Sequence, residues 1–388
     1  MKKLIAILMT LAMILSLAAC NAKTPAATDP TDKSNPTDAP TETPTETKGD
    51  DTEPAGTESI MYFCINLGDL SFNDLGWKGC QDAAAKYGWT AEVIELGKDT
   101  SVYENAFLDA LDSGKYTIVV SQSNFGLSDL CIKYAPEYKD IKFITYDLGA
   151  STDISTIDNM FGISFKQNEG SFLAGALAGK LTKSNKIGIF LFNDVPVGND
   201  FATGYIAGVR YSNPEAKISV AYGNGSADAS KLQEVSSAMF DSGVDVIYGV
   251  SGSAYPGLAK EATRRGGFAS GIYAIGVDSD MWTVYKASEN ADIADVIITS
   301  MQKKVDEAVL YTLDRYVEGT LPFGTVEGYG ILENGVGMAD NEWYRANTPA
   351  DVLTYMDALT EDVVSGKVEV PSYFDFADYD AFAAWRDQ

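Results

Sequence analysis

Histidine is absent from this 388-residue chain, and its absence removes several kinds of active site. A Ser-His-Asp triad, a zinc site with histidine ligands and a histidine general base are all impossible without an imidazole. Basic residues are also scarce, since 29 Lys and Arg stand against 55 Asp and Glu and the net charge is −26. An acidic surface repels nucleic acid and anionic lipid headgroups, so we expect neither as a partner of the folded part.

Cysteines and long apolar runs are rare as well. Three cysteines, Cys64, Cys80 and Cys131, lie in the body of the chain, and their number and spacing do not match a metal site. We expect buried free thiols in a strand and two helices, with a disulfide between two of them as the alternative. No segment after residue 19 approaches the roughly 20 apolar residues that a membrane-spanning helix needs.

The one long apolar run, Leu4 to Leu17, follows two lysines and leads through small residues to Cys20. This pattern is typical of a signal peptide over residues 1–19. The four residues L-A-A-C that end at Cys20 resemble a bacterial lipobox, which implies cleavage before Cys20 and a diacylglycerol on its thiol. Two acyl chains hold a protein stably at a membrane. We therefore expect a lipid-anchored protein on the extracytoplasmic face of the cell membrane, with an ordinary secreted protein as the alternative.

Residues 21–58 contain mainly Thr, Pro, Ala, Asp and Glu. Such a segment cannot bury enough apolar surface to offset the entropy of ordering, so we predict a disordered tether over 20–58 that begins at the lipidated cysteine. A solvated tail without a selected length is the alternative. The body that follows has about 330 residues, which is too many for one ordinary core and predicts two domains.

From residue 60 onward, short β-branched or aromatic runs alternate with helical patterns, which is typical of parallel α/β layers. The predicted strands are 60–65, 91–95, 116–120, 141–145, 157–163, 186–191, 217–221, 244–249, 271–276 and 293–298. The predicted helices are 73–87, 101–113, 127–135, 166–182, 198–211, 228–241, 255–264 and 300–318.

Two similar sequence segments indicate two similar lobes. Asp112-Ser113-Gly114 and Asp241-Ser242-Gly243 each combine a helix stop and a glycine cap before a buried strand. We place the switch between the lobes after Asp147. Because ligands of open α/β sheets bind beyond the carboxyl ends of the strands, residues directly after strands are the candidate site.

The segment after the first predicted strand carries three such residues. Asp69 offers a carboxylate to hydroxyl groups, Phe72 a ring that stacks on a flat ligand, and Asn73 an amide that donates and accepts. The alternative is structural, with Asn73 as the cap of the next helix and Phe72 as its hydrophobic staple. The residue types favour neither reading.

Later strands end in further charged groups. Asp147 follows one strand, Asp278 ends another with Asp280 and Trp282 beyond it, and Lys303 and Lys304 come later. Strand-end carboxylates with a lysine suit a polyhydroxylated ligand, because carboxylates accept from hydroxyl and ring N–H groups. Taken singly, each carboxylate also fits a surface turn or a cap.

Glycines in two regions point to close packing. Gly252 follows a strand without a full nucleotide-binding fingerprint, and we expect it to allow the backbone to approach a ligand closely. Gly170 and Gly175 lie in a predicted helix, where we expect them to permit tight helix packing.

Six motifs in chain order carry a family resemblance. They are G-D-x-S-F-N at 68–73 with Trp77, G-x-S-F-x-Q-x-E-G-S-F-L-A-G at 162–175, 193–208, 243–247, 275–280 and T-S-M-Q-K-K-V at 299–305. On these motifs the chain resembles the basic membrane protein family of bacterial lipoproteins, which includes purine nucleoside receptors of ABC transporters.

This resemblance implies an α/β, type I periplasmic-binding-protein fold, in which two Rossmann-like lobes are joined by a three-crossover hinge and hold a ligand in the cleft. The N-terminal lobe would contain 59–164 plus about 299–322, and the C-terminal lobe 165–298 plus about 323–388. We expect the aromatic and acidic segment 341–388 to pack on a lobe as structural cover.

The resemblance also implies roles for the site residues. By motif, Phe72 stacks on a nucleobase, Asp69 and Asn73 border it, and Asp147 contacts the base edge. The ribose is faced by Gly252, Asp278 and Lys303, with Lys304 as the other possible register.

One position departs from the family pattern. Nucleoside-binding members often carry an aromatic residue where this chain has Ala227, and that residue forms the second half of a ring sandwich. Loss of one stacking face removes roughly 1 kcal/mol of aromatic contact. Tyr222, Tyr255 and Trp282 are the candidates to replace it.

The sequence thus predicts a lipid-anchored substrate-binding protein of an ABC importer, not an enzyme, with permease subunits as partners, no cofactor and no bound metal. The expected ligand is a purine nucleoside, captured by hinge closure. The alternatives are a sugar, riboflavin or another ligand on the same fold, a sensory receptor, or an adhesin. An exported nucleoside hydrolase holding Ca²⁺ between Asp69, Asp147 and Asp278 is a further alternative, although no D-x-D-x-x-x-D-D pattern follows the first strand.

Overall fold

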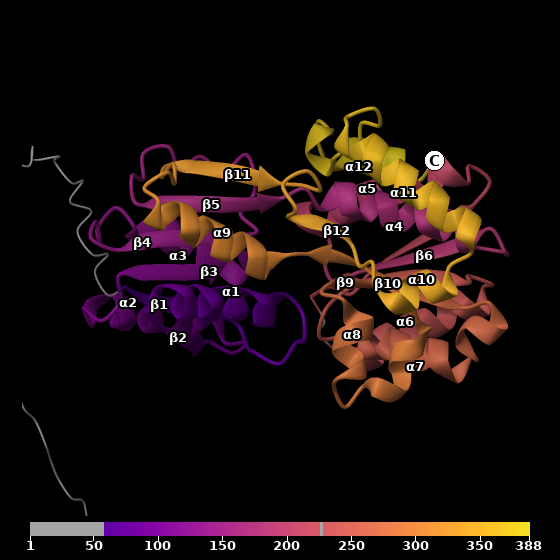
Figure 1. Ribbon diagram of the computed structural model, residues 1–388, viewed down its shortest axis with the longest axis horizontal. Helices are drawn as coiled ribbons and strands as arrows, with labels where there is room; N and C mark the ends of the chain where they lie inside the picture. Colours follow the sequence, from indigo (N-terminus) through magenta and orange to yellow (C-terminus); the bar gives the residue numbers. More distant parts are fainter. Residues whose placement is uncertain (1–57, 226–227) are drawn as a thin grey trace, which may run out of the picture. The chain divides into compact units, whose positions relative to one another are not determined.

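Two six-stranded sheets form the framework of the computed structural model, which describes residues 58–225 and 228–388 (Figure 1). The first sheet has the spatial order β11 (Thr325–Tyr329), β5 (Met160–Phe165), β4 (Lys142–Tyr146), β3 (Ile118–Gln122), β1 (Ser59–Cys64) and β2 (Thr90–Glu95). The second has the order β12 (Val336–Met338), β10 (Ile297–Lys303), β9 (Tyr273–Asp278), β8 (Val246–Val250), β6 (Lys186–Leu191) and β7 (Lys217–Tyr222). All neighbours are parallel except β12, which runs antiparallel to β10.

The two sheets repeat one doubly wound topology. Strands β2-β1-β3-β4-β5 of the first lobe correspond to β7-β6-β8-β9-β10 of the second. In each lobe the second strand in chain order lies on one side of the first strand, and the strands that follow are added on the other side. The reversal lies between β1 and β3 in one lobe and between β6 and β8 in the other. This arrangement confirms the predicted α/β fold of the type I periplasmic-binding class, and it defines where a ligand site is expected.

Helices cover both faces of each sheet (Figure 1). In the first lobe they are α1 (Phe72–Tyr87), α2 (Tyr103–Asp112), α3 (Leu127–Tyr134) and α9 (Val305–Val317). In the second lobe they are α4 (Gln167–Leu181), α5 (Pro196–Ser212), α6 (Ala229–Asp241), α7 (Pro256–Arg264), α8 (Met281–Lys286), α10 (Glu342–Asn347), α11 (Ala350–Val364) and α12 (Tyr379–Arg386).

Strand β1 shows why these sequences form buried parallel strands. Ile60, Tyr62 and Cys64 enter one core cluster, whereas Met61 and Phe63 enter the cluster on the opposite face of the sheet. Successive side chains of a strand point to opposite faces, so a run of apolar residues fills both layers at once. Such a strand needs helices on both sides, which the alternating sequence supplies.

The central helices of the second lobe approach each other very closely. A Cβ added at Gly175 would overlap the Tyr205 carbonyl oxygen, and one added at Gly208 would overlap that of Phe172. Gly170 packs against a strand instead, because a Cβ added there would lie 2.9 Å from the Cε of Met301 in β10. The tight helix packing predicted for Gly175 is therefore confirmed, whereas Gly170 lets α4 approach β10.

The chain crosses between the lobes three times. The first crossing follows Phe165, next to the lobe boundary expected at 164 and not at the switch placed after Asp147, because β5 still pairs with β4. The second lies between Lys303 and Val305 rather than near 299, because β10 pairs with β9 as far as Gln302. The third follows Tyr329 rather than preceding 323, since β11 pairs with β5.

Several element boundaries differ from the predictions for a related reason. The predicted strands 116–120, 244–249 and 271–276 begin at Ile118, Val246 and Tyr273, because the apolar residues before them, of which Tyr116 and Val244 are buried, lie in the connections that lead into the strands. The predicted helix 300–318 begins only at Val305, and the predicted strand 293–298 is a short 3-10 helix up to Val296 followed by β10. Burial alone does not distinguish a strand from the turn that leads into it.

Other features of the described chain agree with the sequence. Cys64, Cys80 and Cys131 are free and buried, in β1, α1 and α3 respectively. Helix α11 packs on α4, and Phe382 of α12 is fully buried, so the C-terminal segment does cover the second lobe.

The signal peptide over 1–19, Cys20, the tether up to residue 57 and Ala227 lie outside the described residues. Among the described helices, none combines the length and the apolarity needed to cross a membrane.

Candidate functional site

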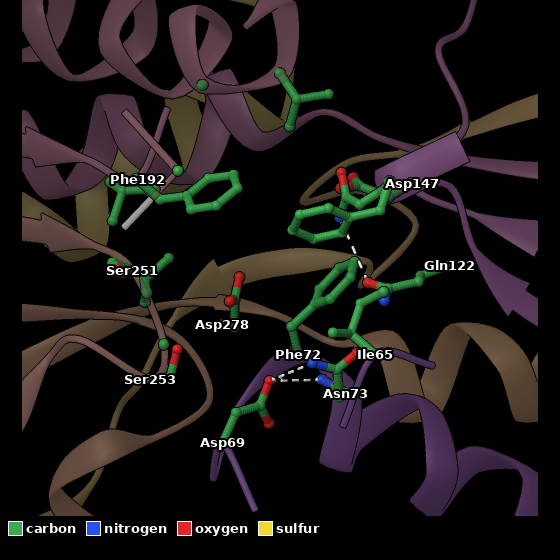
Figure 2. Close-up of a pocket in the computed structure, with 18 of the residues that line it drawn as sticks. Ile65, Asp69, Phe72, Asn73, Gln122, Asp147, Phe192, Ser251, Ser253 and Asp278 are labelled. Atoms are coloured by element: carbon green, nitrogen blue, oxygen red, sulfur yellow. Dashed lines mark hydrogen bonds between the residues drawn. The ribbon is translucent and has the colours of Figure 1, made fainter. Parts of the chain in front are cut away.

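A cavity of about 290 Å³ lies beyond the carboxyl ends of strands from both sheets (Figure 2). Residues after β1, β3 and β4 line it from the first lobe, and residues at or after β6, β8, β9 and β10 line it from the second. These positions include both topological reversals, where ligands of doubly wound sheets bind. The polar lining residues are Asn66, Asp69, Asn73, Lys98, Gln122, Asn124, Asp147, Ser251, Ser253, Asp278 and Lys303.

Asp69 organises the turn that leads into α1. Its carboxylate accepts the backbone N–H groups of Ser71 and Asn73 at 3.0 Å and of Asp74 at 3.2 Å, and also the Asn73 side-chain amide at 2.9 Å (Figure 2). Asp69, rather than Asn73, therefore satisfies the free N–H groups at the start of the helix, which corrects the capping alternative. Burial raises the pKa of Asp69 from its usual value, while the three backbone bonds act in the opposite direction.

Two amide atoms in the cavity wall have no partner among the described residues. Asn73 Oδ1 and Gln122 Nε2 are both buried and both lack a hydrogen bond. The bond from the Asn73 Nδ2 to Asp69 fixes which end of that amide is the acceptor. Each unsatisfied buried group lowers the free energy of unfolding by about 1–3 kcal/mol. This wall therefore favours a ligand that brings a donor for Asn73 Oδ1 and an acceptor for Gln122 Nε2.

Asp147 and Lys303 form a buried ion pair between the lobes. The Lys303 Nζ lies 2.6 Å from Asp147 Oδ1, and the two side chains are only 2% and 6% exposed. The ammonium also lies 5.0–5.5 Å from the ring centroids of Phe72, Phe165 and Phe201. One Asp147 oxygen is thus already engaged, which leaves the other for a ligand.

Of the two candidate lysines, Lys303 lines the cavity. Lys304 instead donates to Asn334 Oδ1 at 2.6 Å on the exposed side of the crossing. Successive residues of a strand end point to opposite faces, which explains why only one of the pair reaches the cleft.

Asp278 ends β9 with a partly exposed carboxylate in the cleft. Ser71 of the other lobe donates its hydroxyl to Asp278 Oδ2 at 3.1 Å. Burial raises the pKa of Asp278 to about 6, although the Lys303 charge and the Ser71 hydrogen bond oppose the shift. The carboxylate is therefore ionised near pH 7 and has lone pairs left for hydroxyl donors.

Gly252 marks a close approach between the lobes. A Cβ added there would lie 2.9 Å from the Ser71 Cβ, so the backbone of the second lobe fits against the first only without a side chain. We expected this glycine to admit a ligand, but the close contact that the structure shows is with Ser71. Next to it, Ser279 Oγ donates to the Leu70 carbonyl at 2.8 Å and adds another interlobe hydrogen bond.

The aromatic lining differs from the sequence expectation. Tyr222, Tyr255 and Trp282 were the candidates for a second stacking ring, and none of them lines the cavity. Tyr255 is fully buried, Trp282 stacks on Trp343 at 5.5 Å, and the Tyr222 hydroxyl donates to Asn199 at 2.8 Å. The rings that do line the cavity belong to Phe72, Tyr103, Phe125, Phe192 and Phe201.

The structure brings all seven predicted ligand-binding residues into this one cavity: Asp69, Phe72, Asn73, Asp147, Gly252, Asp278 and Lys303. Their contact with a ligand stays a prediction. Sequence reasoning missed Gln122 and Phe192. The predicted third strand stopped at residue 120, two residues short of Gln122, while Phe192 directly follows a correctly predicted strand and was within reach of the same rule.

The three aspartates do not form a metal site. Within residues 58–225 and 228–388, no group of three or more Asp, Glu or Cys side chains converges closely enough to hold a metal ion. Asp69 is occupied by the helix start and Asp147 by Lys303, so the arrangement expected for a calcium-dependent hydrolase is not assembled from these residues.

Comparison with known proteins agrees with this geometry. The model of the Bmp family, described as ABC transporter substrate-binding protein PnrA-like, matches residues 59–371. The chain belongs to the Bmp family. This confirms the resemblance to basic membrane proteins and makes the chain an ABC transporter substrate-binding protein by family.

Relatives of this Bmp-family chain extend along most of its length. It is 33% identical over 313 residues to the CD4+ T-cell-stimulating antigen of Listeria monocytogenes, covering 78% of this chain and 84% of that protein. It is 27% identical over 323 residues to the ABC transporter nucleoside-binding protein BmpA of Lactococcus lactis, covering 81% and 88%. Basic membrane protein A of Borreliella burgdorferi is 28% identical over 305 residues, covering 78% and 84%.

Solved structures support the fold. A solute-binding protein of an ABC transporter system from Aeropyrum pernix aligns with a TM-score of 0.70 at 23% identity, covering 84% of this chain and 96% of that one. A second, from Conexibacter woesei, aligns with a TM-score of 0.65 at 21% identity, covering 82% and 99%. ABC transporter substrate-binding proteins bind a small ligand outside the cytoplasm and work with permease subunits, and by family this chain is one of them.

Proposed function

We propose that this Bmp-family protein is a lipid-anchored receptor that captures a purine nucleoside and delivers it to the permease of an ABC importer. The observation that carries the choice of ligand is the unpaired pair of amide atoms, Asn73 Oδ1 and Gln122 Nε2, in the wall of an aromatic cavity. A purine presents adjacent donors and acceptors on its edge and a flat face for Phe72, so it can satisfy both atoms at once.

The other half of a nucleoside also has a partner in this cavity. Asp278 is ionised near neutral pH and faces the cleft, where it can accept from the two ribose hydroxyls. The Lys303–Asp147 pair lines the same cavity and places a positive and a negative group in its wall. A sugar without a base could offer hydroxyl partners to the amide atoms but no flat face to Phe72, and we therefore rank it second.

Capture is proposed to proceed by hinge closure. The lobes are joined by three crossings, and Ser71, Gly252 and Ser279 already meet across the cleft. A ligand that contacts both lobes stabilises the form in which they are together, and only through those contacts. Attachment at Cys20 and the acidic tether would keep the receptor near its permease.

The first experiment is a thermal-shift screen of residues 21–388, unfolded and refolded to remove any carried ligand. We expect inosine, guanosine or adenosine at 100 times the dissociation constant to stabilise the protein by about 2.7 kcal/mol. A shift with sugars, riboflavin or amino acids alone would reject the nucleoside assignment while leaving the transport role.

The variant Gln122→Met tests the amide wall directly, because methionine has a similar volume and no donor. We expect nucleoside affinity to fall about tenfold, while the stability of the ligand-free protein stays equal or rises because a buried unpaired donor has been removed. Gln302→Met, in β10 but outside the cavity lining, serves as the control. Calorimetric titration and urea unfolding measure both effects, and a Gln122→Met protein that binds like the parent would contradict the assignment.

A further inference from the structure

Phe192 lies directly after β6, in the lobe opposite Phe72, and lines the same cavity. We propose that Phe192 supplies the second aromatic face of the site, so that a flat ring is held between Phe72 of one lobe and Phe192 of the other. The inference rests on the proposed function and deepens it, because it makes ring stacking from both lobes the basis of ligand choice.

The backbone of Phe192 is held on both sides. Its N–H donates to the Val250 carbonyl at 2.9 Å, and its own carbonyl accepts the Gly225 N–H at 2.9 Å. These bonds tie Phe192 to the end of β8 and to the turn after β7. A ring on such an anchored backbone loses little conformational freedom when it contacts a ligand.

The Phe192 ring points into the cavity from one side, and the Phe72 ring points into it from the other (Figure 2). Phe72 is itself held by an edge contact with Tyr146, with ring centroids 5.1 Å apart. In residues 58–225 and 228–388, no ring–ring or cation–π contact involves Phe192. Its face is therefore available to a ligand ring.

The other cavity aromatics are less suited to this role. Phe201 is only 4% exposed, so little of its face is open to a ligand ring. Tyr103 is 3% exposed and its hydroxyl donates to the Gly97 carbonyl. Phe125 is 52% exposed and belongs to the same lobe as Phe72, so closure of the lobes does not bring it toward the Phe72 ring.

Calorimetric titration of residues 21–388 tests the proposal with Phe192→Ala, Phe192→Leu and Phe192→Trp, against inosine, adenosine, riboflavin and D-ribose. Base–aromatic stacking predicts that Phe192→Ala weakens nucleoside binding about 5- to 150-fold, with Phe192→Leu in between. Phe192→Trp keeps affinity within about threefold and gains a ligand-dependent change in tryptophan fluorescence beyond that of the parent. Phe374→Ala, an exposed phenylalanine of the same lobe outside the cavity, should bind like the parent.

The outcomes separate the two proposals. One outcome is that the parent binds nucleosides and that Phe192→Ala or Phe192→Leu, shown by urea unfolding to be folded, binds them equally well. This inference is then overturned and the proposed function stands. If the parent binds riboflavin but no nucleoside, and Phe192→Ala weakens that binding, the proposed function fails and the ring sandwich stands. Binding of D-ribose alone overturns both.

Discussion

Asp147 and Asp278 occupy equivalent places in the two lobes. Each lies at the carboxyl end of the fourth strand of its lobe, counted along the chain, which is β4 in the first lobe and β9 in the second. Both adopt a left-handed backbone, with φ of 61° and 64°, which few residues other than glycine tolerate and which is often retained at functional sites. Their surroundings differ: Asp147 is paired with Lys303, whereas Asp278, in the described part of the chain, accepts only the Ser71 hydroxyl. Asp278 therefore has more lone pairs left for ligand hydroxyls than Asp147 has.

The raised pKa of Asp278, about 6, predicts a pH-dependent affinity. Protonation removes the charge that accepts ligand hydroxyls, so nucleoside affinity should fall as the pH decreases through 6, by up to about tenfold per pH unit. The stability effect has the opposite sign: an ionised, partly buried Asp278 lowers the free energy of unfolding above pH 6, and this cost disappears toward pH 4. Titration calorimetry from pH 5 to 8 measures the first effect.

Two variants separate Asp278 from other titrating groups. Asp278→Asn should bind weakly with a flat pH profile, whereas Asp280→Asn should keep the parent profile, because Asp280 caps α8 outside the cavity lining. An Asp278→Asn protein that retains the parent pH dependence would assign the titration to another residue.

At the scale of elements, the pair α4 and α5 anchors the second lobe beneath the site. Helix α4 begins directly after the first crossing, and the loop after β6 leads through Phe192 into α5. The glycines at their interface let backbone meet backbone, so the helices cannot separate or slide without loss of many contacts. This rigidity holds the strand ends of the second lobe in position.

Gly208→Ala tests this packing. The added methyl would overlap the Phe172 carbonyl of a neighbouring helix, which cannot move aside as a side chain would. We expect a loss of about 1–3 kcal/mol or more in the free energy of unfolding, measured by urea denaturation. Gly337→Ala is the matched control, because no atom lies within 4 Å of its added Cβ. Equal stabilities of the two variants would refute the close-packing argument.

At the scale of the whole described molecule, three polar contacts join the lobes beside the cavity. They are the Lys303–Asp147 ion pair and the hydrogen bonds Ser71–Asp278 and Ser279–Leu70. The first two involve groups that also line the cavity, whereas Ser279 and Leu70 lie outside its lining. Ser279 therefore reports on lobe association without direct ligand contact.

Ser279→Ala should destabilise the form in which the two lobes are together, without removing a direct contact to the ligand. One hydrogen bond contributes about 0.5–1.5 kcal/mol, so ligand affinity should fall roughly 2- to 12-fold, mainly through faster dissociation. Stopped-flow dissociation measures this, with Ser288→Ala as the control because its hydroxyl bonds within its own lobe to Tyr285. Unchanged dissociation would show that this bond does not contribute to closure.

Local patterns were sufficient for most elements. Periodicity and glycine stops predicted α1, α3 to α7 and strands such as β6 closely, because a helix or a buried strand depends on side chains that are near in sequence. The second and third crossings were misplaced because strand pairing is not local. Whether residues 299–303 belong to a helix or to β10 depends on β9 and β12 as neighbours.

The sequence by itself determined the doubly wound α/β class, the absence of histidine chemistry and the strand-end residues that surround the cavity. Only the tertiary structure decided which of their atoms are free: Asp69 is taken by a helix start and Asp147 by Lys303, while Asn73 Oδ1 and Gln122 Nε2 lack partners among the described residues. Residue types state what a side chain can bond, but its partners come from segments distant along the chain, and folding alone brings those segments together.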